Sequence, residues 1–346
     1  MAKYIDIAGR KVGLDYAPLV IAEIGINHGG SLQVAKEMVD AASRAGIEIV
    51  KHQTHIVECE MSDEAKKVIP GNSDQSIYHI MERCSLSEKD EIALQKYVES
   101  KGMIFISTPF SFAAVDRLEK MGVPAFKIGS GEMNNYKLVE YIASKNKPII
   151  LSTGMNDIAS VKKAVAAIRK HHDMYAILHT TNLYPTPPHL VRLNALEDIK
   201  KEFAGDIIGL SDHTITNSAC IAAMAMGASI VERHFTDTMD RVGEDIVCSM
   251  DETRARELVQ ASKDVFAMRG GHKNEIPEEQ VTRDFAYNTI VLATDVKAGT
   301  ILTADMLTTK RPGNIGIRAE EFDNIVGRTV NKDLKKNTHI TYKDLK

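Results

Sequence analysis

The sequence predicts an α/β protein in which a (β/α)8 barrel is followed by a small β-rich domain. Two observations predict the barrel: eight short Val/Ile-rich runs recur between residues 19 and 236, and amphipathic helical segments separate them. Apolar strands that alternate with helices are typical of a parallel sheet covered by helices. A third observation predicts the second domain, because from about residue 284 short strand-like runs alternate with turn residues and no helical repeat dominates.

The expected barrel strands are short, and each ends at or near a polar residue or a glycine. In chain order they are LVIAEIG (19–25), IEIVKHQT (47–54), MIFISTP (103–109), AFKIGS (125–130), PIILSTG (148–154), YAILHTT (175–181), IIGLSDH (207–213) and SIVERHFT (229–236). Helices are expected where apolar residues recur at i, i+3 and i+4, as in LQVAKEMVDAASRAG and IASVKKAVAAIRKHH. Eight such units suit a closed barrel. An open doubly wound sheet is the alternative, but GINHGG after the first strand lacks the G-x-G-x-x-G spacing typical of that fold.

Segments outside the repeat also have expected roles. Residues 1–17 read as a hairpin that caps one end of the barrel. The insertion His55–Ser85 is longer than a usual βα loop, and such loops are often functional. A helix follows the eighth strand, and the Gly-rich and charged segment 269–280 then reads as a linker. The expected domains are therefore residues 1–282 and residues 283–346.

Composition and charge narrow the class of protein. The 346 residues include 43 Lys+Arg and 47 Asp+Glu, which gives a net charge of −4, and 44% are hydrophobic. This balance excludes a disordered chain or a disulfide scaffold, and it offers no basic surface for nucleic acid. The N-terminus has no secretory signal, and the longest apolar stretch is too short to cross a membrane. Cys59, Cys84, Cys220 and Cys248 show no metal-ligand spacing, so reduced thiols and a cytoplasmic location are expected.

Polar side chains occupy the ends of nearly all the expected strands, where a β/α barrel has its active site. They are Glu23, Lys51, Gln53, Thr108, Lys127, Ser130, Glu132, Ser152, Thr181, Asn182, Ser211, His213 and His234. Each one alone is equally well explained as a solvated rim residue. A barrel that served only as a scaffold would not need so many, so the sequence predicts an active site at this end.

Two of these residues, His213 in LSDHT and His234 in ERHFT, end adjacent expected strands. Neighbouring strands lie about 4.8 Å apart, so the two imidazoles can share a divalent ion. A single histidine is more often structural, but an acid flanks each of these, Asp212 and Glu232. With two protein nitrogens, water or substrate would complete the coordination, as in a catalytic site.

Lys51 and Lys127 form a second pair at the strand ends. A lysine in a barrel mouth acts as an anion clamp or as a Schiff-base nucleophile. Hydroxyl groups and glycine turns accompany the lysines, and together they suit a phosphate and a carboxylate bound side by side. A Schiff-base lysine aldolase remains the alternative.

Ten segments in order carry a resemblance to a known family. They are IAEIGINHGGS, VKHQT, STPFS, FKIGSGE, LSTGM, TTNLYPTP, GLSDHT, ERHFT, GEDIVCSMD and VKAGTILTADMLTTKRPGN. Over nearly its whole length the chain resembles the bacterial N-acetylneuraminate (sialic acid) synthase family. Its last part resembles the antifreeze-like (SAF, β-clip) domain. The resemblance implies a TIM barrel followed by that domain.

The resemblance also implies an activity. It is a transferase reaction that condenses phosphoenolpyruvate with N-acetylmannosamine and water, and it releases phosphate by cleavage of a C–O bond. His213 and His234 would hold Mn²⁺ or Mg²⁺, which polarises the sugar aldehyde. The implied catalytic residues are Glu23, Lys51, Lys127 and Glu132, with Glu132 or metal-bound water handling the proton transfers.

Binding roles follow from the same resemblance. The implied phosphoenolpyruvate contacts are Lys51, Thr108, Lys127, Ser130, Ser152, Asn182 and Ser211. The implied sugar contacts are Glu23, Gln53, Tyr184, Asp245 and Arg311. Arg311 would come from the partner subunit, so the resemblance implies a domain-swapped homodimer.

Two departures from the family pattern affect the sugar rather than the chemistry. Glu244 stands where the family has a proline, and RPGNIGI after Arg311 is one residue longer than the common form. Relatives of this family also use a diacetamido-trideoxy hexose, for legionaminate or pseudaminate, or a sugar 6-phosphate. The same chemistry on such a sugar is therefore an alternative. A non-catalytic sugar-binding protein is another, but it would tolerate a degraded barrel mouth, and this one is intact.

Overall fold

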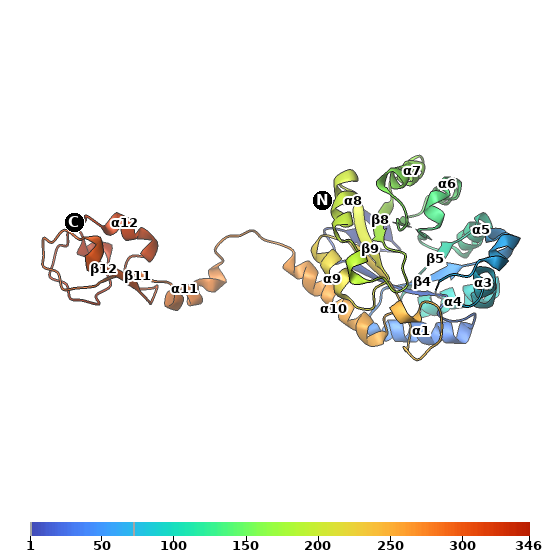
Figure 1. Ribbon diagram of the computed structural model, residues 1–346, viewed down its shortest axis with the longest axis horizontal. Coiled ribbons are helices and arrows are strands. Elements are labelled where there is room, and N and C mark those ends of the chain that lie inside the picture. The colour runs from blue at the N-terminus through green and yellow to red at the C-terminus, as the bar shows by residue number, and fades with distance from the viewer. Residues whose placement is uncertain (1, 72) are drawn as a thin grey trace. The chain divides into compact units, whose positions relative to one another are not determined.

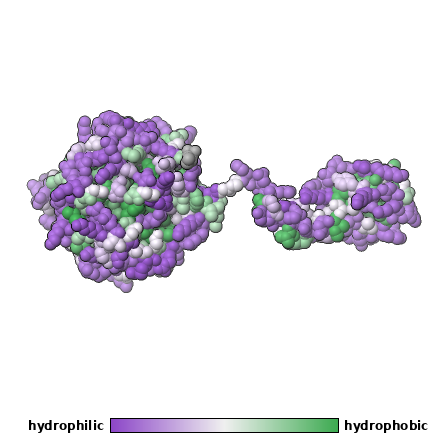
Figure 2. Space-filling model, turned by 180° about the vertical axis from the view of Figure 1, so that it is seen from behind, coloured by the Kyte–Doolittle hydropathy of each residue, from purple (hydrophilic) through white to green (hydrophobic). Residues whose placement is uncertain are grey.

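The computed structural model describes residues 2–71 and 73–346. Residue 1, where the expected hairpin 1–17 begins, and residue 72, in the expected insertion, lie outside the described residues. The chain forms two compact units, Met1–Gly270 and Gly271–Lys346 (Figure 1). The face seen in Figure 2 is mainly hydrophilic, and each unit has its own apolar core.

Eight parallel strands close into a barrel in the order β10-β3-β4-β5-β6-β7-β8-β9. They are β3 (Leu19–Gly25), β4 (Ile49–Thr54), β5 (Ile104–Pro109), β6 (Phe126–Ile128), β7 (Ile149–Ser152), β8 (Tyr175–Thr180), β9 (Ile207–Asp212) and β10 (Ile230–His234). The predicted (β/α)8 barrel is confirmed. The open doubly wound sheet is wrong, because the last strand pairs with the first and sets His234 opposite Glu23.

Helices surround the barrel (Figure 1). They are α1 (Leu32–Ala45), α4 (Glu88–Ser100), α5 (Phe112–Met121), α6 (Tyr136–Ala143), α7 (Ile158–Arg169), α8 (Asn194–Glu202), α9 (Ser218–Ala225) and α10 (Glu252–Met268). Helix α1 shows why they form where they do. The Ser31 side chain accepts a hydrogen bond from the Val34 amide at its start, and Gly46 adopts φ 82° at its end. Between these caps the apolar face buries Met38 and Val39 against the strands.

A hairpin closes the amino-terminal end of the barrel. Strands β1 (Tyr4–Ile7) and β2 (Arg10–Gly13) are antiparallel. Their side chains Ile5, Ile7 and Val12 pack against apolar residues of the barrel strands in one buried cluster. This end is filled with apolar side chains, so the polar strand ends lie at the opposite, carboxyl end.

The insertion after β4 is partly helical. It contains α2 (Val57–Glu60), a 3₁₀ turn at Asp63–Lys67 and α3 (Ile77–Cys84). Ile80 and Cys84 of α3 pack against Ile26, which follows β3. The insertion is thereby fastened to the carboxyl end of the barrel.

The second unit contains α11 (Gln280–Ala286), β11 (Thr289–Leu292), β12 (Leu307–Lys310) and α12 (Phe322–Ile325). Strands β11 and β12 are antiparallel. Residues 337–342, NTHITY, are one of the strand-like runs expected in this unit, but they contribute only an isolated bridge between Val291 and His339. Helix α11 belongs to this unit, since Gly313 donates a backbone hydrogen bond to Asp284 at 2.8 Å. The division between the units thus precedes the boundary expected at residue 282.

None of the described helices combines the length and the apolar composition needed to cross a membrane.

Two stacked histidines are buried beside the barrel, His28 after β3 and His52 on β4. Their Nε2 atoms are 3.2 Å apart, and His28 Nδ1 accepts a hydrogen bond from the Gly30 amide. His28 Nε2 therefore carries the proton and donates to His52, so both rings are neutral. Burial lowers the pKa of His28 to about 4.

Because the buried His28 resists protonation, we expect the folded protein to lose stability as the pH falls. The unfolded chain takes up a proton at His28 near pH 6.5, but the folded chain takes it up only near pH 4. The stability is therefore present above pH 6.5 and is lost as the pH falls through this window. His28→Asn should remove up to about 3 kcal/mol of that pH dependence. Urea unfolding between pH 4 and 7 measures it, with exposed His272→Asn as the control. Parallel curves for wild type and His28→Asn would contradict the assignment.

Candidate active site

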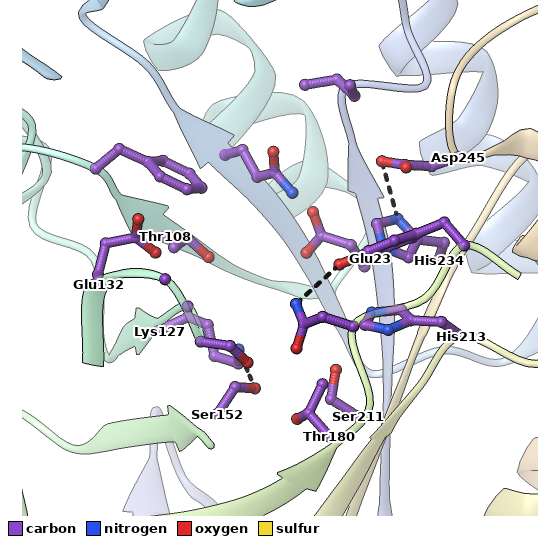
Figure 3. A pocket seen from close by; sticks show the side chains of 18 of the residues that line it. Glu23, Thr108, Lys127, Glu132, Ser152, Thr180, Ser211, His213, His234 and Asp245 are labelled. Carbon is purple, nitrogen blue, oxygen red and sulfur yellow. Dashed lines mark hydrogen bonds and ion pairs between the residues drawn. The ribbon is translucent and has the colours of Figure 1, made fainter. Parts of the chain in front are cut away.

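A pocket of about 420 Å³ opens at the carboxyl ends of the barrel strands (Figure 3). It brings together all but two of the site residues predicted from the sequence. These are Glu23, Lys51, Gln53, Thr108, Lys127, Ser130, Glu132, Ser152, Asn182, Tyr184, Ser211, His213, His234 and Asp245. Of the other two, Thr181 follows β8 but does not line this pocket. Arg311 belongs to the second unit and follows β12.

Parallel register places the functional side chains at one level of the barrel. Glu23 of β3 lies opposite Lys51 of β4 on one side and opposite His234 of β10 on the other. Successive residues of a strand point to opposite faces, so Glu232 and His234 both face the interior. Residues of the barrel strands, rather than of loops, therefore form the floor of the pocket.

Charged side chains form this floor. Glu232 Oε1 lies 3.6 Å from the Nζ atoms of both Lys51 and Lys127, and Lys51 also pairs with Glu23. All four side chains are almost completely buried. Buried charges persist only when they are paired, so this network is one unit.

Burial and neighbouring charges set the pKa values of the network. Burial raises the pKa of Glu23 to about 7, although Lys51 opposes the rise. Burial lowers the pKa of Lys127 to about 8, and Glu232 partly offsets it. For Lys51 the charges of Glu23 and Glu232 outweigh burial and raise its pKa. For Glu232 the two lysines outweigh burial and lower its pKa.

Hydroxyl groups surround the lysines. Lys127 Nζ donates to Ser152 Oγ at 2.7 Å, Lys51 Nζ donates to Thr108 Oγ1 at 3.3 Å, and Ser211 Oγ donates to Glu232 at 3.1 Å. Ser130 Oγ accepts from the Gly154 amide at 2.9 Å. Ammonium groups, hydroxyl groups and backbone amides that converge in this way suit an anionic ligand with several oxygens.

The two histidines lie on the other side of the pocket from Lys127 and Ser152 (Figure 3). Their ring centroids are 5.3 Å apart. Burial, with the neighbouring His234, lowers the pKa of His213 to about 4, and burial, with the charge of Lys51, lowers the pKa of His234 to about 3. Both imidazoles are therefore neutral near pH 7 and have lone pairs to offer.

These imidazoles fit a metal ion in an open site. His213 Nδ1 lies 2.8 Å from the Thr181 carbonyl, so it donates and leaves Nε2 free as a ligand. His234 Nδ1 is buried without a hydrogen-bond partner among the described residues and lies 3.6 Å from an Asp245 oxygen. The described residues contain no group of three or more metal-ligating side chains, so further ligands would have to come from water or substrate.

Two carboxyl groups that line the pocket have pKa values close to 7. Burial raises the pKa of Glu132 to about 7 and that of Asp245 to about 6. Groups with such values can both accept and donate a proton near pH 7.

Glu232 and His55 line the pocket and were not predicted as site residues. Glu232 was noted only as an acid near His234, although its spacing of two residues from His234 on a strand was a usable signal. His55 begins the insertion after β4. Its ring nitrogens contact Gln53 Oε1 at 3.1 Å and Glu60 Oε1 at 2.8 Å, and it stacks on Phe110. These contacts orient the Gln53 amide, and no motif marks them.

Comparison with known proteins covers both units. Residues 38–274 match the NeuB family, and residues 287–346 match the SAF domain. The N,N'-diacetyllegionaminic acid synthase of Legionella pneumophila is 34% identical over 94% of each chain. The N-acetylneuraminate-9-phosphate synthase of Homo sapiens is 32% identical over 93% of this chain and 91% of that one. The crystal structure of N-acetylneuraminic acid synthetase from Leptospira borgpetersenii in complex with citrate is 26% identical, with a TM-score of 0.75 over 82% of this chain and 95% of that one.

Two glycines at the pocket provide a matched pair of variants: Gly131 lines it, and Gly154 lies against its lining residues Asn182 and Ser130. A Cβ at Gly154 would overlap the Asn182 side chain and lie 2.9 Å from Ser130 Oγ, whereas none of the described atoms lies within 4 Å of a Cβ at Gly131. Gly154→Ala should therefore lower the free energy of unfolding by about 1–3 kcal/mol, and Gly131→Ala should change it by less than about 0.5 kcal/mol. Urea denaturation measures both, and equal effects would contradict this description of the pocket wall.

Proposed function

Since the chain belongs to the NeuB family, with a C-terminal SAF domain, we propose that it condenses phosphoenolpyruvate with N-acetylmannosamine and water to give N-acetylneuraminate and phosphate. One observation carries the proposal. A single pocket holds two buried lysines and, across from them, two neutral histidines. An anion site that faces a metal-ligand pair suits the joining of a phosphorylated enol to an aldehyde.

The proposed phosphoenolpyruvate site is the lysine side of the pocket. The ammonium groups of Lys51 and Lys127 would pair with its carboxylate and phosphate. Thr108, Ser130, Ser152, Asn182 and Ser211 would donate hydrogen bonds to the remaining oxygens. Asn182 Oδ1 and Glu232 Oε2 are buried without hydrogen-bond partners among the described residues, which is typical of a site built around a ligand.

The proposed sugar site is the histidine side. His213 and His234 would hold a divalent ion, Mn²⁺ or Mg²⁺, whose chemistry is to polarise the aldehyde oxygen of the open-chain sugar. Glu23, Gln53, Tyr184 and Asp245 would hold the hydroxyl groups. Glu132 would accept a proton from the attacking water and donate one to the aldehyde oxygen as it becomes a hydroxyl group.

The proposed reaction balances as follows. C3 of phosphoenolpyruvate forms a bond to C1 of the sugar, and water adds its oxygen to C2. The bond between C2 and the bridging oxygen then breaks, so phosphate leaves with that oxygen. Lys127, whose pKa lies near 8, stabilises the departing phosphate.

A second candidate has the same chemistry on a diacetamido-trideoxy hexose. The similarity to the Legionella pneumophila synthase, 34% identical over 94% of each chain, favours it. Phosphate release with N-acetylmannosamine and with a diacetamido-trideoxy hexose, side by side, decides between the two sugars.

The contact of Arg311 with the N-acyl group of the sugar, from the partner subunit of a domain-swapped homodimer, stays a prediction. It is part of the proposal because Arg311 is in the matched SAF domain.

Labelled substrate tests the bond that breaks. With ¹⁸O at the bridging position of phosphoenolpyruvate, the label should appear in the released phosphate, as measured by mass spectrometry. Label retained in the sugar acid would contradict C–O cleavage. A covalent adduct on Lys51 or Lys127 after borohydride treatment with pyruvate would instead favour the Schiff-base aldolase.

Removal of divalent ions tests the role of the histidines. A chelator should abolish phosphate release and Mn²⁺ should restore it. His213→Ala and His234→Ala should each lower kcat/KM by about 100-fold or more with Mn²⁺ present. His171→Ala, on the exposed surface, is the control. Full activity of the two variants, or of the enzyme in chelator, would refute the metal site.

A further inference from the structure

Glu244 is a carboxylate at the mouth of the pocket. It lies in the loop between β10 and α10, next to Asp245, and both line the pocket. Glu244 Oε1 accepts a hydrogen bond from Arg83 Nη2 of α3 at 2.8 Å. The Glu244 side chain is 14% exposed and that of Arg83 is 44% exposed. The ion pair therefore holds the carboxylate in place at the wall while the guanidinium faces solvent.

The charges around the pocket are unequally distributed. The described residues that line it include five carboxylates, Glu23, Glu132, Glu232, Glu244 and Asp245, and two cationic side chains, Lys51 and Lys127. Both lysines lie at the floor, where Glu23 and Glu232 pair with them. Arg83 is not among the lining residues. The wall at Glu244 thus presents a carboxylate, and the two cationic side chains among the described lining residues lie at the floor instead.

We propose that Glu244, held by Arg83, makes the sugar end of this pocket select an acceptor that carries no phosphate group. The inference rests on the proposed function and assigns its substrate class. A phosphate monoester carries a charge of about −1.5 to −2 at pH 7. Next to a partly buried carboxylate this charge is repelled, whereas a neutral sugar uses the same oxygens as hydrogen-bond acceptors.

The test compares N-acetylmannosamine with its 6-phosphate at saturating phosphoenolpyruvate, so that the phosphate ester cannot occupy the lysine side. The measured quantity is the ratio of kcat/KM for the two sugars. If a diacetamido sugar proves to be the acceptor, the inhibition constant of the 6-phosphate against that sugar replaces the ratio. Glu244→Gln keeps the shape of the side chain but removes its charge, and it should shift either quantity about tenfold in favour of the phosphate ester.

Arg83→Gln is the matched control. Both variants break the ion pair between Arg83 and Glu244, but only Glu244→Gln removes the carboxylate. The charge explanation predicts that Arg83→Gln keeps or strengthens the discrimination against the phosphate ester. Melting temperatures of both variants confirm that the fold persists.

Wild type that prefers the 6-phosphate overturns the inference and the choice of N-acetylmannosamine, but it leaves the proposed condensation with phosphoenolpyruvate intact. Discrimination unchanged in Glu244→Gln overturns the inference alone. An equal loss of discrimination in both variants also overturns it. In that case the loop position fixed by the ion pair between Arg83 and Glu244, rather than the charge of Glu244, would select the sugar. Absence of phosphate release with every sugar overturns the proposed function and this inference together.

Discussion

The buried pairing of Lys51 and Lys127 with Glu23 and Glu232 is the interaction on which the rest of the site depends. These four groups come from four strands, and closure of the barrel brings β10 beside β3 so that they meet. No single one of them would be stable as an isolated buried charge. Their combined field also acts beyond the network, because the Lys51 charge helps to keep His234 neutral. The anion side and the metal-ligand side of the pocket are therefore electrostatically one structure.

Polar and apolar constraints divide the barrel between its two ends. The hairpin of β1 and β2 fills one end with apolar side chains, and this packing tolerates no charge. At the other end the strand termini carry the polar groups, and α3 fastens the insertion above them through Ile80 and Ile26. Stability is thus provided away from the chemistry, as is typical of β/α barrels.

The barrel was predictable because each strand is buried on both faces and reads as a continuous apolar run. The polar residues of the pocket were predictable because parallel strands deliver their carboxyl ends to one edge. His55 was not, since its contacts with Gln53 and Glu60 depend on how the insertion folds back, and spacing does not encode that. The second unit was harder for another reason. Isolated bridges such as Val296–Leu334 hold much of it together, and single pairs leave no alternating pattern in the sequence.

The closed hairpin end has a kinetic consequence. Because Ile5, Ile7 and Val12 pack the barrel with apolar side chains beneath the lysines, the pocket formed by the described residues is entered from the strand ends. A ligand held at the floor by Lys127 would lie deeper than one held beside Asp245. On the proposed function, phosphoenolpyruvate would then bind before the sugar. The sugar acid would leave before the phosphate held at the floor. The topology of a plugged barrel would by itself impose an order on the catalytic cycle.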